Sequence, residues 1–166
     1  MCYNYMLENT LFCFTFCIGL RYEIIRFLYT LYKKEIMKFA YTIIYVENVP
    51  ETIDFYEKAF GFKKKFITPE NDYSELISGE TTIAFASIEL GNSNVKDGFI
   101  KSSLLEKPFG VELAFTTENI DFDFEKAIKA GAIEVEKLIT KPWGQKVGYV
   151  KDNNGFLIEI CTPIKN

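Results

Sequence analysis

Two stretches of this chain carry the same pattern, and this repeat constrains the fold more than any other feature. Ala40–Phe62 reads AYTIIYVENVPETIDFYEKAFGF, and Val111–Ala132 reads VELAFTTENIDFDFEKAIKAGA. Aligning them on the shared EN dipeptide brings an apolar strand, a helix and a closing glycine, Gly61 or Gly131, into register. Internal similarity at a spacing of about seventy residues indicates a duplicated βα unit.

Each copy of the unit is followed by apolar and alternating runs that indicate further strands. The predicted order is βαβββ, twice, with helices at 50–60 and 120–130 and strands at 38–46, 62–68, 73–77, 82–89, 111–117, 132–138, 146–151 and 156–162. This order does not fit a doubly wound sheet, so the predicted class is α+β with curved mixed sheets. Residues 90–109 read as a long polar loop, either a flexible lid or a linker between modules.

The charge and the histidine content argue against several functions. A formal net charge of −4 gives no reason to expect nucleic acid or an anionic membrane as a partner. The chain has no histidine, which is the commonest transition-metal ligand and the usual general base near neutral pH. Carboxylates can still bind hard cations. The four cysteines, Cys2, Cys13, Cys17 and Cys161, lack a CxxC spacing and indicate a reducing, cytoplasmic location.

Residues 1–36 differ from the rest of the chain. The apolar run Leu11–Leu20 is about half the length of a membrane span, and the residues before it lack the positive charge of a secretory signal. Three interpretations stay open: a start-site artefact or dispensable extension with Met37 as the natural start, an amphipathic helix that docks on the protein or on a membrane surface, and a signal or span.

The repeat and a second segment together resemble a known superfamily. YVENVPETIDFYEKAFGF near the start and KPWGQKVGYVKDNNGFLIEICTP near the end, with the order βαβββ–βαβββ, are similar to the vicinal oxygen chelate superfamily. Its members include glyoxalase I, extradiol dioxygenases, and fosfomycin- and bleomycin-resistance proteins. The resemblance implies a domain at 37–166, with modules at about 37–89 and 110–164 that form a curved mixed sheet around a cavity. It also implies a homodimer.

The same resemblance points to four metal-ligand positions. By motif these fall on Tyr41, Ala84, Glu112 and Glu159, where enzyme members usually carry histidines and carboxylates. A phenol, a methyl group and two carboxylates make a poor site for zinc, nickel or iron, although they could hold magnesium or manganese weakly. The chain therefore looks more like the metal-free, bleomycin-resistance-like branch, and we expect no metal and no other cofactor.

The expected ligand-binding residues are Tyr41, Tyr45, Phe85, Glu112, Trp143 and Glu159. Glu112 and Glu159 each place a charge within an apolar strand, which favours a site over a purely structural role. The aromatic residues have two interpretations, stacking on a ligand or packing in the core. Cys161 has no neighbouring base that would activate it as a nucleophile, and no catalytic residue is predicted.

Three functions fit these residues. The first is a metal-independent protein that binds a small cationic or aromatic molecule, without nucleic acid or a membrane span. The alternative is a lyase, isomerase or dioxygenase of the same superfamily with a non-standard divalent-metal site. The third is a structural or regulatory dimer whose groove binds nothing. One scaffold hosts many chemistries, so the resemblance alone does not choose between them.

Overall fold

A computed structural model describes residues 37–164 of the chain. The expectations for residues 1–36 lie outside this range. No helix in the described part of the chain is long and apolar enough to cross a membrane.

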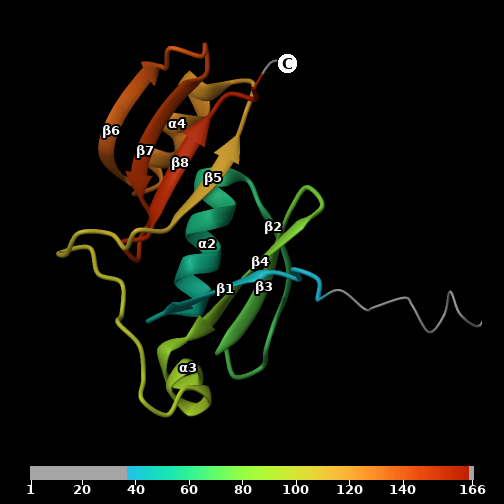
Figure 1. The fold of residues 1–166 in the computed structure, drawn as a ribbon. Coiled ribbons are helices and arrows are strands. Elements are labelled where there is room, and N and C mark those ends of the chain that lie inside the picture. Colours follow the sequence, from blue (N-terminus) through green and yellow to red (C-terminus); the bar gives the residue numbers. More distant parts are fainter. Residues whose placement is uncertain (1–36, 165–166) are drawn as a thin grey trace, which may run out of the picture. The chain divides into compact units, whose positions relative to one another are not determined.

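The first module forms one mixed sheet and one long helix (Figure 1). Its elements are β1 (Thr42–Val46), α2 (Val49–Phe60), β2 (Lys63–Ile67), β3 (Tyr73–Ser78) and β4 (Thr81–Ser87). The strand order is β1-β4-β3-β2, with β1 parallel to β4 and the other neighbours antiparallel. This sheet is called sheet A below.

The second module repeats the arrangement after a short helix, α3 (Ile88–Asn94). Its elements are β5 (Glu112–Thr116), α4 (Ile120–Lys129), β6 (Ile133–Thr140), β7 (Lys146–Lys151) and β8 (Leu157–Cys161). The order in this second sheet, called sheet B, is β5-β8-β7-β6, and β5 runs parallel to β8. The predicted α+β class and the two βαβββ modules are confirmed, but the strands form two separate sheets that are not closed around a cavity.

Local sequence explains where α2 and α3 begin and end. The Asn48 side chain accepts a hydrogen bond from the backbone N–H of Glu51 at 3.1 Å, and Gly61 ends α2 in the left-handed conformation at φ 73°. Helix α3 lies where the sequence analysis expected the end of a strand and a loop. Its cap is Ser87, whose hydroxyl accepts from the N–H of Leu90 at 3.1 Å.

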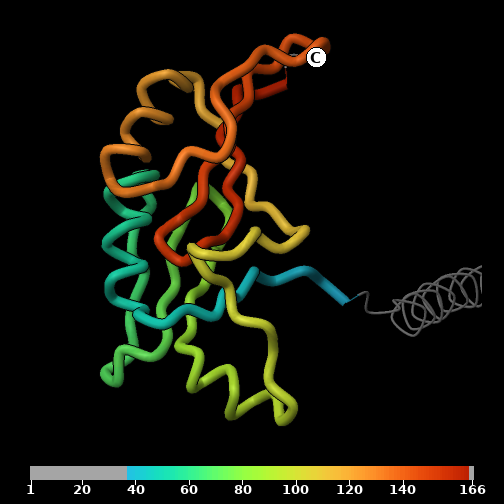
Figure 2. The backbone as a smooth tube through the Cα atoms, turned by 90° about the vertical axis from the view of Figure 1, so that its left-hand side faces the viewer, coloured from blue at the N-terminus to red at the C-terminus, as the bar shows by residue number. Residues whose placement is uncertain are grey.

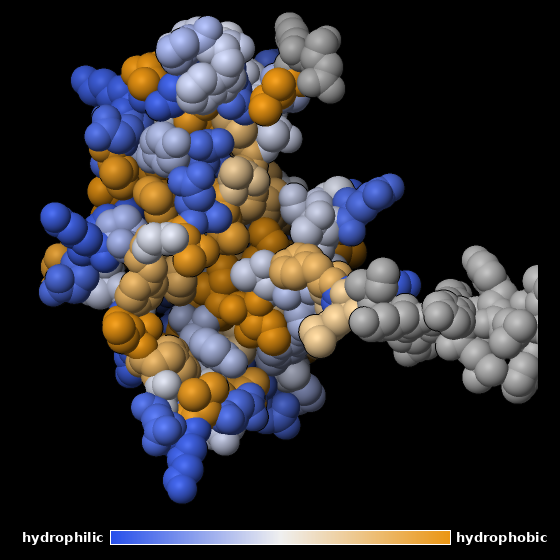
Figure 3. Space-filling view, in the orientation of Figure 1, coloured by the Kyte–Doolittle hydropathy of each residue, from blue (hydrophilic) through white to orange (hydrophobic). Residues whose placement is uncertain are grey.

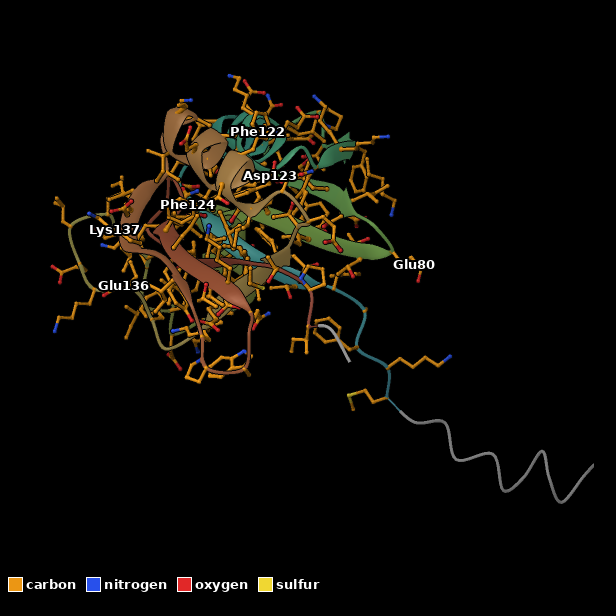
Figure 4. All side chains as sticks on the ribbon, turned by 90° about the horizontal axis from the view of Figure 1, so that it is seen from above. Glu80, Phe122, Asp123, Phe124, Glu136 and Lys137 are labelled. Atoms are coloured by element: carbon orange, nitrogen blue, oxygen red, sulfur yellow. The ribbon has the colours of Figure 1, made fainter. Side chains whose placement is uncertain are left out.

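The inner faces of both sheets and the two long helices share one hydrophobic core. Helix α2 contacts α4, and both views of the backbone show them adjacent (Figure 2). Phe124 of α4 is buried against sheet B, whereas Phe122 points outward and is largely exposed (Figure 4). Gly148 of β7 makes room for Phe124, because a Cβ there would lie 2.7 Å from the ring.

A buried polar contact joins the two modules inside this core. The Tyr56 hydroxyl, on α2, donates to a carboxylate oxygen of Asp152, in the β7–β8 turn, at 2.9 Å. Both residues are fully buried. Asp152 also accepts from the backbone N–H groups of Asn154 and Phe156, and the amide of Asn154 donates to the hydroxyl of Thr52 on α2. The turn of one module is therefore hydrogen-bonded to the helix of the other.

Candidate functional site

Each sheet has an inner face in the core and an outer face that carries polar side chains. On β8, Ile158 and Ile160 are buried in the core, so the alternating residues Glu159 and Cys161 belong to the outer face. On β5, Glu112 lies on this same face and is exposed. The outer face of sheet B therefore carries both predicted carboxylates.

Strand pairing places the repeat-related positions at matching sites in the two sheets. Ile43 of β1 pairs with Ala84 of β4, and Ala114 of β5 pairs with Glu159 of β8. Ile43 and Ala114 correspond in the alignment of the repeats, and Ala84 and Glu159 correspond when TIAFAS of β4 is matched to FLIEICT of β8. Glu159 in sheet B therefore has Ala84 as its counterpart in sheet A, and only one of the two positions carries a functional group.

The half-buried carboxylate of Glu159 accepts a hydrogen bond from the hydroxyl of Tyr149, on neighbouring β7, at 2.7 Å. This bond is the main reason that the pKa of Tyr149 is raised to about 12, and partial burial and the charges of Glu159 and Glu112 add to it. The Nζ of Lys141 lies 5.9 Å from the centre of the Tyr149 ring, near the limit of a cation–π contact. No ion pair of Glu112 or Glu159 forms within residues 37–164.

Cys161 completes this face but is poorly suited to nucleophilic chemistry. Burial, the hydrogen bond with Glu159 and the negative charges of Glu159 and Glu112 together raise the pKa of its thiol to about 11, and burial is the largest of these causes. The reactive form of cysteine is the thiolate, which such an environment disfavours. Cys161 therefore acts as a buried, protonated side chain.

The outer face of sheet A contains a carboxylate that the sequence analysis missed. Glu75 of β3, opposite Ala84, forms an ion pair with Lys65 of β2 at 2.7 Å and accepts from the hydroxyl of Tyr73 at 3.1 Å. The hydrogen bond from Lys65 holds the pKa of Glu75 below its usual range, while burial and Glu75 raise the pKa of Tyr73 to about 12. The alternation of Tyr73 and Glu75 with buried Ser74 and Leu76 was the available signal.

The four predicted aromatic residues have different surroundings. Tyr41 precedes β1 and is 45% exposed, and Trp143 is 64% exposed in the β6–β7 loop, where its indole N–H donates to Gln145 at 3.0 Å. Tyr45 is half-buried, and its ring stacks on Phe99.

Phe85 is fully buried on the inner face of sheet A, with its ring 4.7 Å from that of Tyr56. Its expected ligand role does not fit this position, because adjacent strand residues point to opposite faces and Phe85 follows Ala84.

The residues at the family's metal positions do not fit a transition-metal site. The methyl group of Ala84 cannot ligate, and Tyr41 is an exposed phenol directly before the first strand of sheet A, whereas Glu112 and Glu159 belong to sheet B. No cluster of three or more His, Cys, Asp or Glu residues that could hold a metal occurs among residues 37–164. The chemistry of this face is that of carboxylate and phenol groups.

Comparison with known proteins gives a family and several structural neighbours. The sequence model of the Glyoxalase/Bleomycin resistance protein/Dioxygenase superfamily matches residues 38–160. An uncharacterized protein of Mycobacterium bovis is 28% identical over 123 residues, which cover 72% of this chain and 80% of that protein.

Two crystal structures share the fold. A glyoxalase-related enzyme from Fulvimarina pelagi aligns with a TM-score of 0.65 at 18% identity, covering 77% of this chain and 89% of that one. A glyoxalase/bleomycin resistance protein/dioxygenase family enzyme from Burkholderia phytofirmans aligns with a TM-score of 0.62 at 21% identity, covering 74% and 96%. At these identities the likeness extends to the fold alone.

Proposed function

The chain belongs to the glyoxalase/bleomycin resistance protein/dioxygenase superfamily, and we propose that it is a metal-independent protein that binds a small cationic or aromatic molecule on the outer face of sheet B. The fold admits both binding proteins and enzymes, so the proposal depends on the side chains of this face. The enzyme alternative has weaker support, because a family metal position holds Ala84 and burial raises the pKa of the Cys161 thiol, which disfavours a thiolate nucleophile.

The observation that carries the proposal is the environment of Glu159. Its half-buried carboxylate accepts a hydrogen bond from a neutral donor, the Tyr149 hydroxyl, and a second carboxylate, Glu112, lies on the same face. A partly desolvated negative charge is stabilised by a cation, and a neighbouring like charge increases that preference. The Tyr149 ring, and the exposed indole of Trp143, supply aromatic surface for a planar portion of the ligand.

The experiment compares two probes that share a naphthalene ring, 1-naphthylmethylammonium as the cation and 1-naphthylacetate as the anion. We expect the wild-type chain to bind the cation more tightly. Glu159→Gln should weaken the cation by about 1–3 kcal/mol, the usual range for loss of a charge-assisted partner, and leave the anion unchanged or slightly tighter. Isothermal titration calorimetry measures both.

Glu80→Gln is the matched control, because it removes one negative charge from the exposed β3–β4 turn, away from sheet B (Figure 4). A second readout is the titration of Tyr149, whose pKa of about 12 should fall towards the ordinary value of about 10 in Glu159→Gln but not in Glu80→Gln. Tighter binding of the anion, or equal effects of the two substitutions, would contradict the proposed function.

We also propose that the chain is a homodimer in a cytoplasmic location. Support for the dimer comes from the outer face of sheet A, which exposes large hydrophobic side chains, including Ile43, Phe66 and Ile77. The unpaired edges of β1 and β5 also favour association. Exposed apolar patches and free strand edges commonly mark association surfaces. Light scattering at micromolar concentration should give twice the mass of one chain, and the mass of a single chain would exclude the dimer.

A further inference from the structure

A second candidate site lies beside β1, apart from the carboxylate face of sheet B. A cavity of about 350 Å³ opens there between β1 and the segment that joins the modules. We propose that this cavity binds a small, uncharged, apolar molecule, independently of the carboxylate face of sheet B. Its walls come from β1, the segment 95–111, and the first residues of β5 and β8. None of the residues expected to bind the cationic ligand contributes to these walls except Tyr45.

The lining of the cavity sets the chemistry of its ligand. Its described lining residues include no charged side chain, and Thr42, Tyr45 and Ser102 contribute its polar side-chain atoms. Aliphatic and phenylalanine side chains form the rest, and Figure 3 shows hydrophobic side chains gathered over the middle of this view. A charged ligand would lose its hydration here without gaining a partner, so the lining selects an uncharged one.

One wall of the cavity is built by close packing around a glycine. The rings of Tyr45 and Phe99 stack with centroids 4.6 Å apart and 24° between their planes. Gly91 of α3 makes this possible, because a Cβ there would lie 2.7 Å from both rings. Gly91 does not have a positive φ, so its backbone conformation does not require glycine. Glycine is required because any side chain at this position would occupy the space of the two rings.

The later part of the joining segment, residues 104–109, contacts the second module. The Nζ of Lys151 on β7 donates to the carbonyl oxygens of Leu104 at 3.2 Å and Glu106 at 2.8 Å. The rings of Phe109 and Phe156 also approach each other, with centroids 6.5 Å apart. The segment that was expected to be a flexible lid or a linker is thus held at both ends by contacts within the chain, and these contacts support the wall of the cavity. An apolar pocket of this size falls within the range of small-molecule sites.

The test uses N-phenyl-1-naphthylamine, an uncharged probe whose fluorescence rises in apolar surroundings, titrated into the full chain. We expect saturable binding of one probe per chain. Ile43→Lys places a charge in the cavity wall and should weaken the probe at least about tenfold. Ile77→Lys is the matched control, because both isoleucines lie on the outer face of sheet A, the proposed dimer surface, with similar exposure, 42% and 40%. Loss of a dimer would therefore follow from either substitution, whereas only Ile43 lines the cavity.

A second variant distinguishes a loss of probe binding at the cavity from an effect of Ile43→Lys on folding. Val95 lines the cavity from the end of α3 and is 41% exposed, so Val95→Lys should also weaken the probe while the circular dichroism spectrum stays unchanged. Absence of saturable binding, or equal losses in the Ile43 and Ile77 variants, would overturn the proposal.

Glu159→Gln separates this proposal from the proposed function. It should leave the binding of N-phenyl-1-naphthylamine unchanged within about twofold while weakening the cationic probe. If the uncharged probe binds and the cation does not, the proposed function fails and the apolar site stands. If Glu159→Gln weakens the uncharged probe as much as Ile43→Lys does, the probe occupies the carboxylate face and the second site is excluded.

Discussion

Asp152→Ala should lower the free energy of unfolding by about 3–5 kcal/mol, the usual cost of removing one member of a buried hydrogen-bonded network. The substitution leaves the buried hydroxyl of Tyr56 and the backbone N–H groups of Asn154 and Phe156 without their acceptor. It also removes the contact through which the β7–β8 turn of the second module is tied to helix α2 of the first. Urea unfolding followed by circular dichroism measures the change.

Tyr56→Phe gives the comparison, because it removes one of these bonds and keeps the aromatic packing. A loss of about 1.5–3 kcal/mol is expected, the range for a hydrogen bond to a charged group. Asp97→Ala is the control for removal of an aspartate, since Asp97 is exposed in the segment between the modules. Equal stability of the Asp152 and Asp97 variants would show that the buried contact contributes nothing.

A further variant, Asp152→Asn, tests how the stability of this contact depends on pH, and the expected sign follows from the direction of the pKa shift of Asp152. Burial raises the pKa of Asp152 above its ordinary value, although the hydrogen bonds that it accepts oppose the shift. A group whose folded-state pKa is raised contributes stability below its unfolded pKa, and this stability is lost as pH rises through the folded pKa. The stability of wild type relative to Asp152→Asn should therefore increase when pH falls from about 8 towards about 4. A relative stability that decreases on acidification would contradict this assignment.

Most helices and strands of this fold could be predicted from the sequence, because the residues that begin and end them lie close together in the chain. The duplicated pattern, the cap at Asn48 and the glycine at Gly61 act within one turn of the chain. The short helix α3 was missed, since seven residues give little periodicity and its cap, Ser87, ends a strand. The arrangement of the strands in two unclosed sheets depends on how α2 packs against α4, which no local pattern contains.

In the candidate site, too, the features set by local sequence could be predicted, and those set by tertiary contacts could not. Strand alternation was enough to place Glu112 and Glu159 on a polar face, and applied to Phe85 it would have placed that residue in the core. The ion pair that neutralises Glu75 joins two strands and depends on the register between them, which is a tertiary property. The apolar cavity depends on an irregular segment without any period, so its lining could not be predicted from the sequence.

Gly155→Ala should lower the free energy of unfolding by about 2–4 kcal/mol, and it tests how the joining segment is held. Gly155 has φ +90°, which strains any other residue, and an added Cβ would overlap the backbone carbonyl of Ser103. Gly144 isolates the second effect, because it has almost the same φ, +89°, and nothing lies within 4 Å of its added Cβ. Gly144→Ala should therefore cost only about 1 kcal/mol, the part due to backbone strain.

The difference between the two alanine variants measures the packing of the segment against the β7–β8 turn. Because Ser103 follows Ser102 in the wall of the apolar cavity, Gly155→Ala should also displace that wall and weaken N-phenyl-1-naphthylamine, whereas Gly144→Ala should not. Equal destabilisation by the two substitutions, with probe binding intact in both, would mean that the segment moves away from Gly155 at no cost. The cavity would then be a loosely covered surface, and its preference for an uncharged ligand would have to come from β1, β5 and β8 alone.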